Sequence, residues 1–121
     1  MADRLFFGKS RRLLNAADYQ AIFDDVQWKI SIKEILFLSR KNGLDHPRLG
    51  LVISKKNIRH SVQRNRVKRI IRESFRLHQH DLPAVDFIVL ARPGLGDMNN
   101  ADLHNEMAKL WIRLHKKIHA S

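Results

Sequence analysis

The chain has 121 residues, a formal net charge of +11, 44% hydrophobic residues and no cysteine. This length predicts one domain, residues 1–121, with a sizeable hydrophobic core, and the absence of cysteine excludes a disulfide framework and a thiolate metal site. The chain also lacks a signal-peptide core and any apolar run of about 18 residues, so we expect a cytoplasmic protein without a membrane span. Its excess positive charge suits nucleic acid first and an anionic membrane surface second.

The first third of the chain predicts an arm, a short helix and a strand region. Residues 1–14 are basic without a clear period, which predicts an irregular arm. Asn15 is a good N-cap for a helix from residue 16 to about residue 24. One face of this helix carries Tyr19, Ile22 and Phe23. Residues 28–40 alternate and then become continuously apolar, which predicts one bulged strand or two in tandem.

Four further elements follow. Residues 48–54 predict a strand, which we expect to pair with the preceding strand region as an antiparallel hairpin. A helix begins near residue 61, and residues 86–91 predict a strand apolar enough to be buried on both faces. A last helix, capped by Asn100, keeps an apolar period for about four turns and places Trp111 in the core. The order α-β-β-β-α-β-α predicts an α+β fold, a small mixed or antiparallel sheet packed with helices.

The helix that begins near residue 61 has an apolar side and a cationic side. The apolar stripe is made of Val67, Ile70, Ile71, Ser74 and Phe75. The opposite side carries Asn65, Lys68, Arg69, Arg72 and Arg76. Nine of the 23 Lys and Arg residues lie between Lys55 and Arg76, with Glu73 as the only acid, and we expect no acid on the cationic side. Like charges four residues apart repel and a solvated face usually mixes signs, so this pattern favours RNA or DNA binding.

The segment 48–75, RLGLVISKKNIRHSVQRNRVKRIIRESF, resembles the signature region of the protein subunit of bacterial ribonuclease P. It combines a glycine-containing strand, Ser-Lys-Lys, a short spacer and Arg-Asn-Arg-x-Lys-Arg-x-x-Arg-Glu, and the similarity covers nearly the whole chain. The resemblance implies the fold of that family and of related ribosomal protein domains, with a left-handed βαβ crossover against the usual right-handed rule. It also implies a role in an endoribonuclease whose catalytic RNA removes the 5′ leader from precursor tRNA in a Mg²⁺-dependent reaction.

The resemblance implies two binding sites and no catalytic residue in the protein. The RNA subunit would be bound by Arg64, Asn65, Arg66, Lys68, Arg69, Arg72, Lys55 and Lys56. The single-stranded leader would lie in a cleft between the first helix and the sheet, lined by Tyr19, Phe23 and Phe37, while core packing explains Phe23 and Phe37 about equally well. Mg²⁺ would be bound mainly by the RNA, with no metal site in the protein. The expected partners are ribonuclease P RNA and precursor tRNA, without a required protein partner.

Three alternatives explain the same residues differently. A ribosomal or chaperone-like RNA-binding protein would use the basic helix without a processing role. A protein-only nuclease would need clustered carboxylates or a paired histidine with further ligands. His78 with His80, and His115 with His119, lack such ligands, so we expect solvated histidines. A membrane-surface protein is disfavoured because the apolar stripe is narrow.

Overall fold

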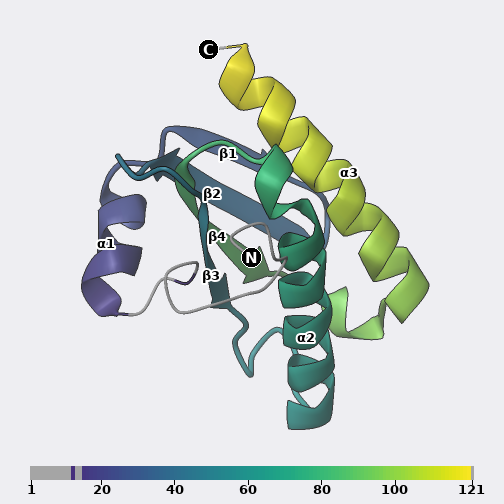
Figure 1. Ribbon diagram of the computed structural model, residues 1–121. Coiled ribbons are helices and arrows are strands. Elements are labelled where there is room, and N and C mark those ends of the chain that lie inside the picture. Colours follow the sequence, from purple (N-terminus) through teal and green to yellow (C-terminus); the bar gives the residue numbers. More distant parts are fainter. Residues whose placement is uncertain (1–11, 13–14, 121) are drawn as a thin grey trace, which may run out of the picture.

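The computed structural model describes Arg12 and residues 15–120 (Figure 1). Apart from Arg12, the irregular arm predicted for residues 1–14 lies outside the described residues. The main elements are α1 (Ala16–Asp24), β1 (Trp28–Ser31), β2 (Ile35–Lys41), β3 (Arg48–Val52), α2 (Ser61–His78), β4 (Val85–Ala91) and α3 (Asn100–His119). Two short 3-10 helices, η2 (Gln79–Asp81) and η3 (Leu95–Asp97), flank β4. The predicted order α-β-β-β-α-β-α is confirmed.

The four strands form one mixed sheet in the order β1-β2-β4-β3. Strand β4 is antiparallel to β2 and parallel to β3, so it separates the two strands that we expected to form a hairpin, and that prediction is wrong. The apolar sequence of β4 explains its place, because a strand buried on both faces is most stable with a partner on each edge. The hairpin that does form joins β1 and β2, with Ile30 opposite Phe37.

Strands β3 and β4 form a βαβ unit with α2 as the connecting helix. Both strands lie side by side and parallel, and α2 packs on the same face of the sheet as α3 (Figure 1). The left-handed sense of this connection stays a prediction from the resemblance.

The main hydrophobic core lies between the sheet and the helices α2 and α3. Four aromatic side chains meet there, namely Phe37, Phe75, Phe87 and Trp111. The ring centroids of Phe37 and Trp111 are 5.1 Å apart, and those of Phe75 and Phe87 are 5.5 Å apart. Trp111 Nε1 donates to Ser74 Oγ at 2.8 Å, which satisfies the polar atom of the buried indole. The prediction that Trp111 is a core residue is confirmed.

Two helices begin at asparagine caps. Asn15 Oδ1 accepts a hydrogen bond from the Asp18 N–H at 2.9 Å, which confirms the predicted start of α1. Asn99 Oδ1 accepts from the Asp102 N–H at 2.8 Å, so α3 is capped one residue before the predicted Asn100. Among the described helices none has the length and apolar character to cross a membrane.

Helix α3 also covers the free edge of the sheet at β1. Arg113 Nη1 donates to the carbonyl oxygen of Ser31 at 3.2 Å, and Lys117 Nζ donates to that of Lys29 at 2.6 Å. An open strand edge exposes unpaired carbonyl groups that can pair with another chain. These two cationic side chains therefore have a structural role at the sheet edge.

The other face of the sheet lies under α1, and we refer to it as the α1 face (Figure 1). Alternate residues of β2, β4 and β3 point to it and form three rows across the sheet. The rows are Arg40 with Asp86 and Arg48, then Leu38 with Ile88 and Gly50, then Leu36 with Leu90 and Val52. Ile22 of α1 is fully buried in a second, smaller cluster with Leu38 and Ile88. The third row is only half-buried, so α1 leaves it partly open.

Candidate nucleic-acid interface

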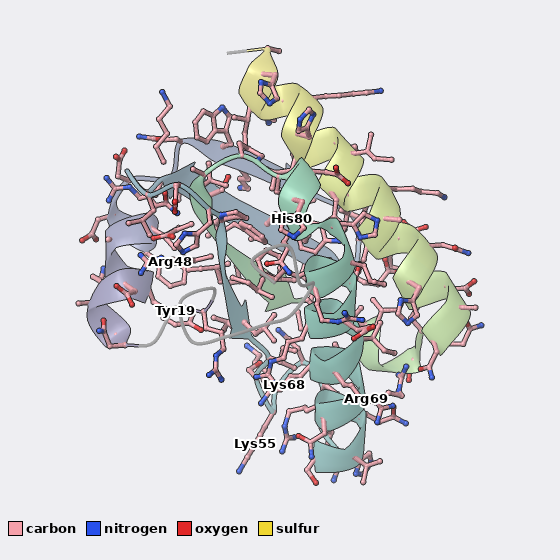
Figure 2. The ribbon with its side chains drawn as sticks, viewed as in Figure 1. Tyr19, Arg48, Lys55, Lys68, Arg69 and His80 are labelled. Atoms are coloured by element: carbon pink, nitrogen blue, oxygen red, sulfur yellow. The ribbon has the colours of Figure 1, made fainter. Side chains whose placement is uncertain are left out.

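The outer side of α2 and the turn before it carry cationic side chains, as predicted. Figure 2 shows Lys68 and Arg69 on α2 and Lys55 in the preceding turn. We define the basic face as Lys55, Lys56, Lys68, Arg69 and Arg72. Lys68 is half-buried and the other four are exposed. Within the described part of the chain, none of the five side chains forms an ion pair or a hydrogen bond.

The basic face repels itself. Lys68 and Arg72 lie four residues apart on α2, a spacing at which like charges destabilise a helix by a few tenths of a kcal/mol. Asn65 is exposed on the same side of the helix and offers a neutral donor and acceptor. A polyanion laid along this side would relieve the repulsion and meet several guanidinium and ammonium groups at once.

Arg76, at the far end of the same side, is neutralised within the protein. It donates to both carboxylate oxygens of Glu73, with distances of 3.1 and 2.5 Å. This hydrogen bond holds the pKa of the Glu73 carboxyl below its ordinary value. The expectation that no acid serves the cationic side is therefore wrong at Arg76, because Glu73 is within reach one turn earlier.

Two arginines of the Arg-Asn-Arg motif contact the protein itself. Arg64 Nη1 donates to the carbonyl oxygens of Ile58 and Arg59 at 3.0 and 2.9 Å, which holds the turn before α2. Arg66 uses all three of its nitrogens: Nε donates to Gln63 Oε1 at 2.7 Å, Nη1 to Asn100 Oδ1 at 2.7 Å and Nη2 to the Gly96 carbonyl at 2.9 Å. Arg66 therefore ties α2 to η3 and the start of α3. The helical period already separates these two residues from the RNA-facing group, since neither arginine falls on the cationic side of the helix.

The α1 face holds two of the three aromatic residues assigned to a leader cleft. Tyr19 is half-buried against the second cluster, and Phe23, one turn later on α1, is 44% exposed. Phe37 is 0% exposed and packs against Phe87 and Trp111 on the opposite face of the sheet. Its assignment to the cleft is wrong in this structure. Successive strand residues point to opposite faces, so the neighbours of Phe37 face α1 and Phe37 does not.

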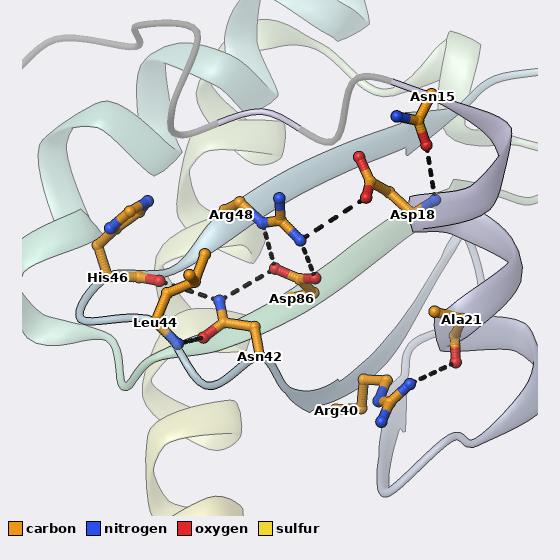
Figure 3. Close-up of polar contacts among 9 residues, drawn as sticks. All are labelled: Asn15, Asp18, Ala21, Arg40, Asn42, Leu44, His46, Arg48 and Asp86. Atoms are coloured by element: carbon orange, nitrogen blue, oxygen red, sulfur yellow. Dashed lines mark hydrogen bonds and ion pairs between the residues drawn. The ribbon is translucent and has the colours of Figure 1, made fainter.

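A partly buried ion pair lies in the polar row beneath α1 (Figure 3). Arg48 donates from Nε to Asp86 Oδ1 at 2.7 Å and from Nη2 to Asp86 Oδ2 at 2.6 Å. Asn42 Nδ2 also donates to Asp86 Oδ1 at 3.0 Å. The hydrogen bond to Asp86 raises the pKa of the Arg48 guanidinium, and Arg48 reaches Asp18 of α1 at 3.9 Å. No local sequence signal predicts this pair, because its partners are 38 residues apart.

Two polar contacts near the middle of helix α1 hold it to the sheet. Tyr19 Oη accepts a hydrogen bond from the Leu51 N–H at 3.2 Å. Arg40 Nη1 donates to the Ala21 carbonyl at 3.1 Å (Figure 3). A helix of nine residues is marginal on its own, so these contacts and the burial of Ile22 set its position.

The described residues include no group of three or more His, Asp or Glu side chains arranged to hold a metal ion. The rings of His115 and His119 are neighbours, with centroids 4.2 Å apart. His78 Nδ1 lies 2.8 Å from the Ser74 carbonyl, to which it donates. His115 and His119 therefore contact each other through their rings, and His78 is hydrogen-bonded to the backbone of its own helix.

A mixed sheet between one small and two long helices, with a basic face on the connecting helix and the preceding turn that has no acidic partner among the described residues, defines a small α+β RNA-binding protein. The model of the Ribonuclease P family matches residues 7–115. The chain belongs to the family of ribonuclease P protein components, and its role is therefore in tRNA 5′ processing within a ribonucleoprotein. Membership in this family favours the processing role over a ribosomal or chaperone-like one.

Relatives and solved structures agree with this assignment. The chain is 54% identical to the ribonuclease P protein component of Pseudomonas aeruginosa over 108 residues, 89% of this chain and 80% of the relative. It is 51% identical to that of Chromohalobacter salexigens over 112 residues, 93% of this chain and 88% of the relative. The RNase P protein of Staphylococcus aureus superposes with a TM-score of 0.79 at 32% identity, covering 89% of this chain and 97% of the other. That of Thermotoga maritima gives 0.74 at 29% identity, covering 84% and 96%.

Proposed function

We propose that the protein assists the catalytic RNA of ribonuclease P in removing the 5′ leader of precursor tRNA, using two surfaces. The basic face binds the RNA subunit, and the α1 face binds the single-stranded leader. The observation that carries the proposal is the basic face itself, five cationic side chains without an acidic partner among the described residues.

The basic face suits binding of a folded RNA. Guanidinium and ammonium groups keep their protons at neutral pH, so they are poor general bases and good phosphate ligands. Arg69 and Arg72 are exposed on adjacent turns of α2, where their planar forks can each grip a phosphate. Arg64 and Arg66 support this surface from within, since they hold the preceding turn and the start of α3.

The α1 face suits a single strand of RNA. Phe23 presents an exposed ring and Tyr19 a half-buried ring, and the third row of the sheet, which packs against the same cluster as Tyr19, offers an apolar floor. Stacking of a base on such a ring contributes about 1 to 3 kcal/mol and tolerates any base. Strand β3 leads from this face into the turn that carries Lys55 and Lys56, so the leader surface adjoins the basic face.

The cleavage chemistry belongs, in this proposal, to the RNA subunit. Mg²⁺ bound mainly by that RNA would supply activation of water and stabilisation of the leaving oxygen. The residues of the protein would bind and orient the two RNAs and offset the repulsion between their phosphates. We therefore assign no catalytic residue to the chain.

The test is reconstitution. The purified protein is mixed with a ribonuclease P RNA at a Mg²⁺ concentration too low for the RNA alone, and cleavage of a leader-bearing tRNA is measured. We expect the protein to restore cleavage at the 5′ end of the mature tRNA sequence. Cleavage by the protein without RNA, or no restoration by a folded protein, would contradict the proposal.

A further inference from the structure

Among the described residues, the hydroxyl of Tyr19 makes one hydrogen bond, in which it is the acceptor. Tyr19 is the one tyrosine in the sequence, and its Oη accepts a hydrogen bond from the Leu51 N–H at 3.2 Å. Leu51 lies on β3, an edge strand of the sheet. The hydroxyl therefore accepts a hydrogen bond that the backbone of a neighbouring strand could otherwise accept. The protein thereby fixes the position of this oxygen on the α1 face.

The proton of the same hydroxyl has no acceptor in the described part of the chain. A phenol can accept a hydrogen bond and also donate one, and only the accepting role is used here. Donation from the Leu51 N–H polarises the hydroxyl and strengthens its own donation to a further group. The half-buried Tyr19 thus presents a positioned donor at the edge of the proposed leader surface.

The geometry directs this donor to the sugar-phosphate backbone. The phenolic O–H lies in the plane of the ring, so a base stacked on the face of the ring does not reach it. Leu51 precedes Lys55 by four residues, which can span at most about 13 Å of chain. Figure 2 shows Tyr19 at α1 and Lys55 in the turn that follows β3. An ionised phosphate oxygen is the acceptor that such a donor favours most.

We propose that the Tyr19 hydroxyl donates a hydrogen bond to a non-bridging phosphate oxygen of one leader nucleotide, an inference that rests on the leader site proposed above. The contact is independent of the base, and it sets the register of the leader on the α1 face because one phosphate has a fixed partner. Phenylalanine at this position keeps the stacking ring and loses the contact.

The experiment uses the reconstituted holoenzyme and precursor tRNAs that each carry one uncharged methylphosphonate in the leader. The dissociation constant is measured for the wild-type protein and for Tyr19→Phe. With wild type we expect one position at which the modification weakens binding by roughly fivefold to tenfold, the effect of one hydrogen bond to a charged group. Tyr19→Phe should weaken binding of the unmodified substrate by a similar factor and be insensitive to the modification at that position.

Mature tRNA and the thermal stability of each variant serve as controls, because Tyr19→Phe also removes the partner of the Leu51 N–H. If the variant keeps the wild-type pattern of methylphosphonate effects, or binds the unmodified leader as wild type does, the hydroxyl makes no phosphate contact and the inference is overturned. If wild type binds precursor and mature tRNA equally, the proposed leader site itself fails.

Discussion

Arg48 and Asp86 occupy paired positions on the parallel strands β3 and β4, and the guanidinium donates to both carboxylate oxygens at 2.7 and 2.6 Å. The pair lies in the polar row of the α1 face, and Arg48 also reaches Asp18 of α1 at 3.9 Å. One guanidinium therefore connects two strands that are distant in sequence to the helix that borders the proposed leader surface.

Replacement of Asp86 by Asn should destabilise the protein by about 2 to 4 kcal/mol, because it leaves the Arg48 charge partly buried without its partner. Urea unfolding measures the change. Asp97→Asn is the matched control, since Asp97 is exposed and its side chain makes no hydrogen bond or ion pair with the described residues. Equal stability of the two variants would show that the buried pair contributes nothing.

Arg66 and Arg69 should respond differently to substitution by Gln. Arg66 donates to three acceptors that join α2 to η3 and α3, so Arg66→Gln should lower the free energy of unfolding by about 1 to 3 kcal/mol. Arg69 is exposed and unpaired among the described residues, and Arg69→Gln should leave stability within about 0.5 kcal/mol of wild type. Thermal unfolding of both variants checks this contrast, and an unchanged midpoint for Arg66→Gln would refute the structural role.

The Glu73 carboxyl should titrate below the ordinary glutamate pKa of 4.5, because Arg76 favours its charged form. A pKa that is lower in the folded state means that the pair stabilises the protein above the unfolded pKa, and that this contribution disappears as the pH falls through the folded pKa. The contribution is small because the pair is exposed to solvent. An NMR titration of Glu73 should show the pKa return toward 4.5 in Arg76→Gln. An identical titration curve in the two proteins would contradict the assignment.

Phe23 and Phe37 should separate binding from folding. Phe23→Ala removes an exposed ring from α1, so it should weaken the binding of precursor tRNA roughly fivefold to a hundredfold relative to that of mature tRNA. The loss of stability should be small, because the ring is exposed. Phe37→Ala should cost about 3 to 5 kcal/mol of stability, because this ring is fully buried in the main core. The free energy of unfolding and the affinities for precursor and mature tRNA are measured for both variants. If a folded Phe23→Ala loses the same affinity for both tRNAs, Phe23 has no role in leader binding.

The period of the sequence predicted the main helices and strands and their order, although it left open whether residues 28–40 form one bulged strand or two. The start of α1 follows from the cap at Asn15, and the helical character of α2 follows from the apolar stripe from Val67 to Phe75, because these are local signals. The sheet order was not predictable in this way. Strand β4 begins 33 residues after the end of β3, and nothing local to β2 or β3 shows that β4 is placed between them.

The candidate site was predictable to the same extent. All five residues of the basic face were among those predicted: Lys68, Arg69 and Arg72 follow from charge and helical period, and Lys55 and Lys56 from the basic turn before the helix. The face of the sheet to which Phe37 points was not found, because the run Ile35 to Leu38 is apolar on both faces and has no alternation to read. The Arg66 contacts and the Tyr19 hydrogen bond depend on elements that meet only in the folded chain.

The central claim is that the uncompensated basic face exists to neutralise RNA. Its most direct test is the salt dependence of binding to a ribonuclease P RNA, measured for wild type, for Arg69→Gln with Arg72→Gln, and for Lys33→Gln with Lys116→Gln. The last pair removes the same charge from exposed residues outside the basic face.

The slope of log K against log salt should fall by about 1.4 to 1.8 for the Arg69 and Arg72 variant, since each lost phosphate contact contributes about 0.7 to 0.9. The Lys33 and Lys116 variant should keep the wild-type slope. Equal slopes in all three proteins, or equal reductions in both variants, would contradict the claim, because the charge of the protein would then act without regard to its position.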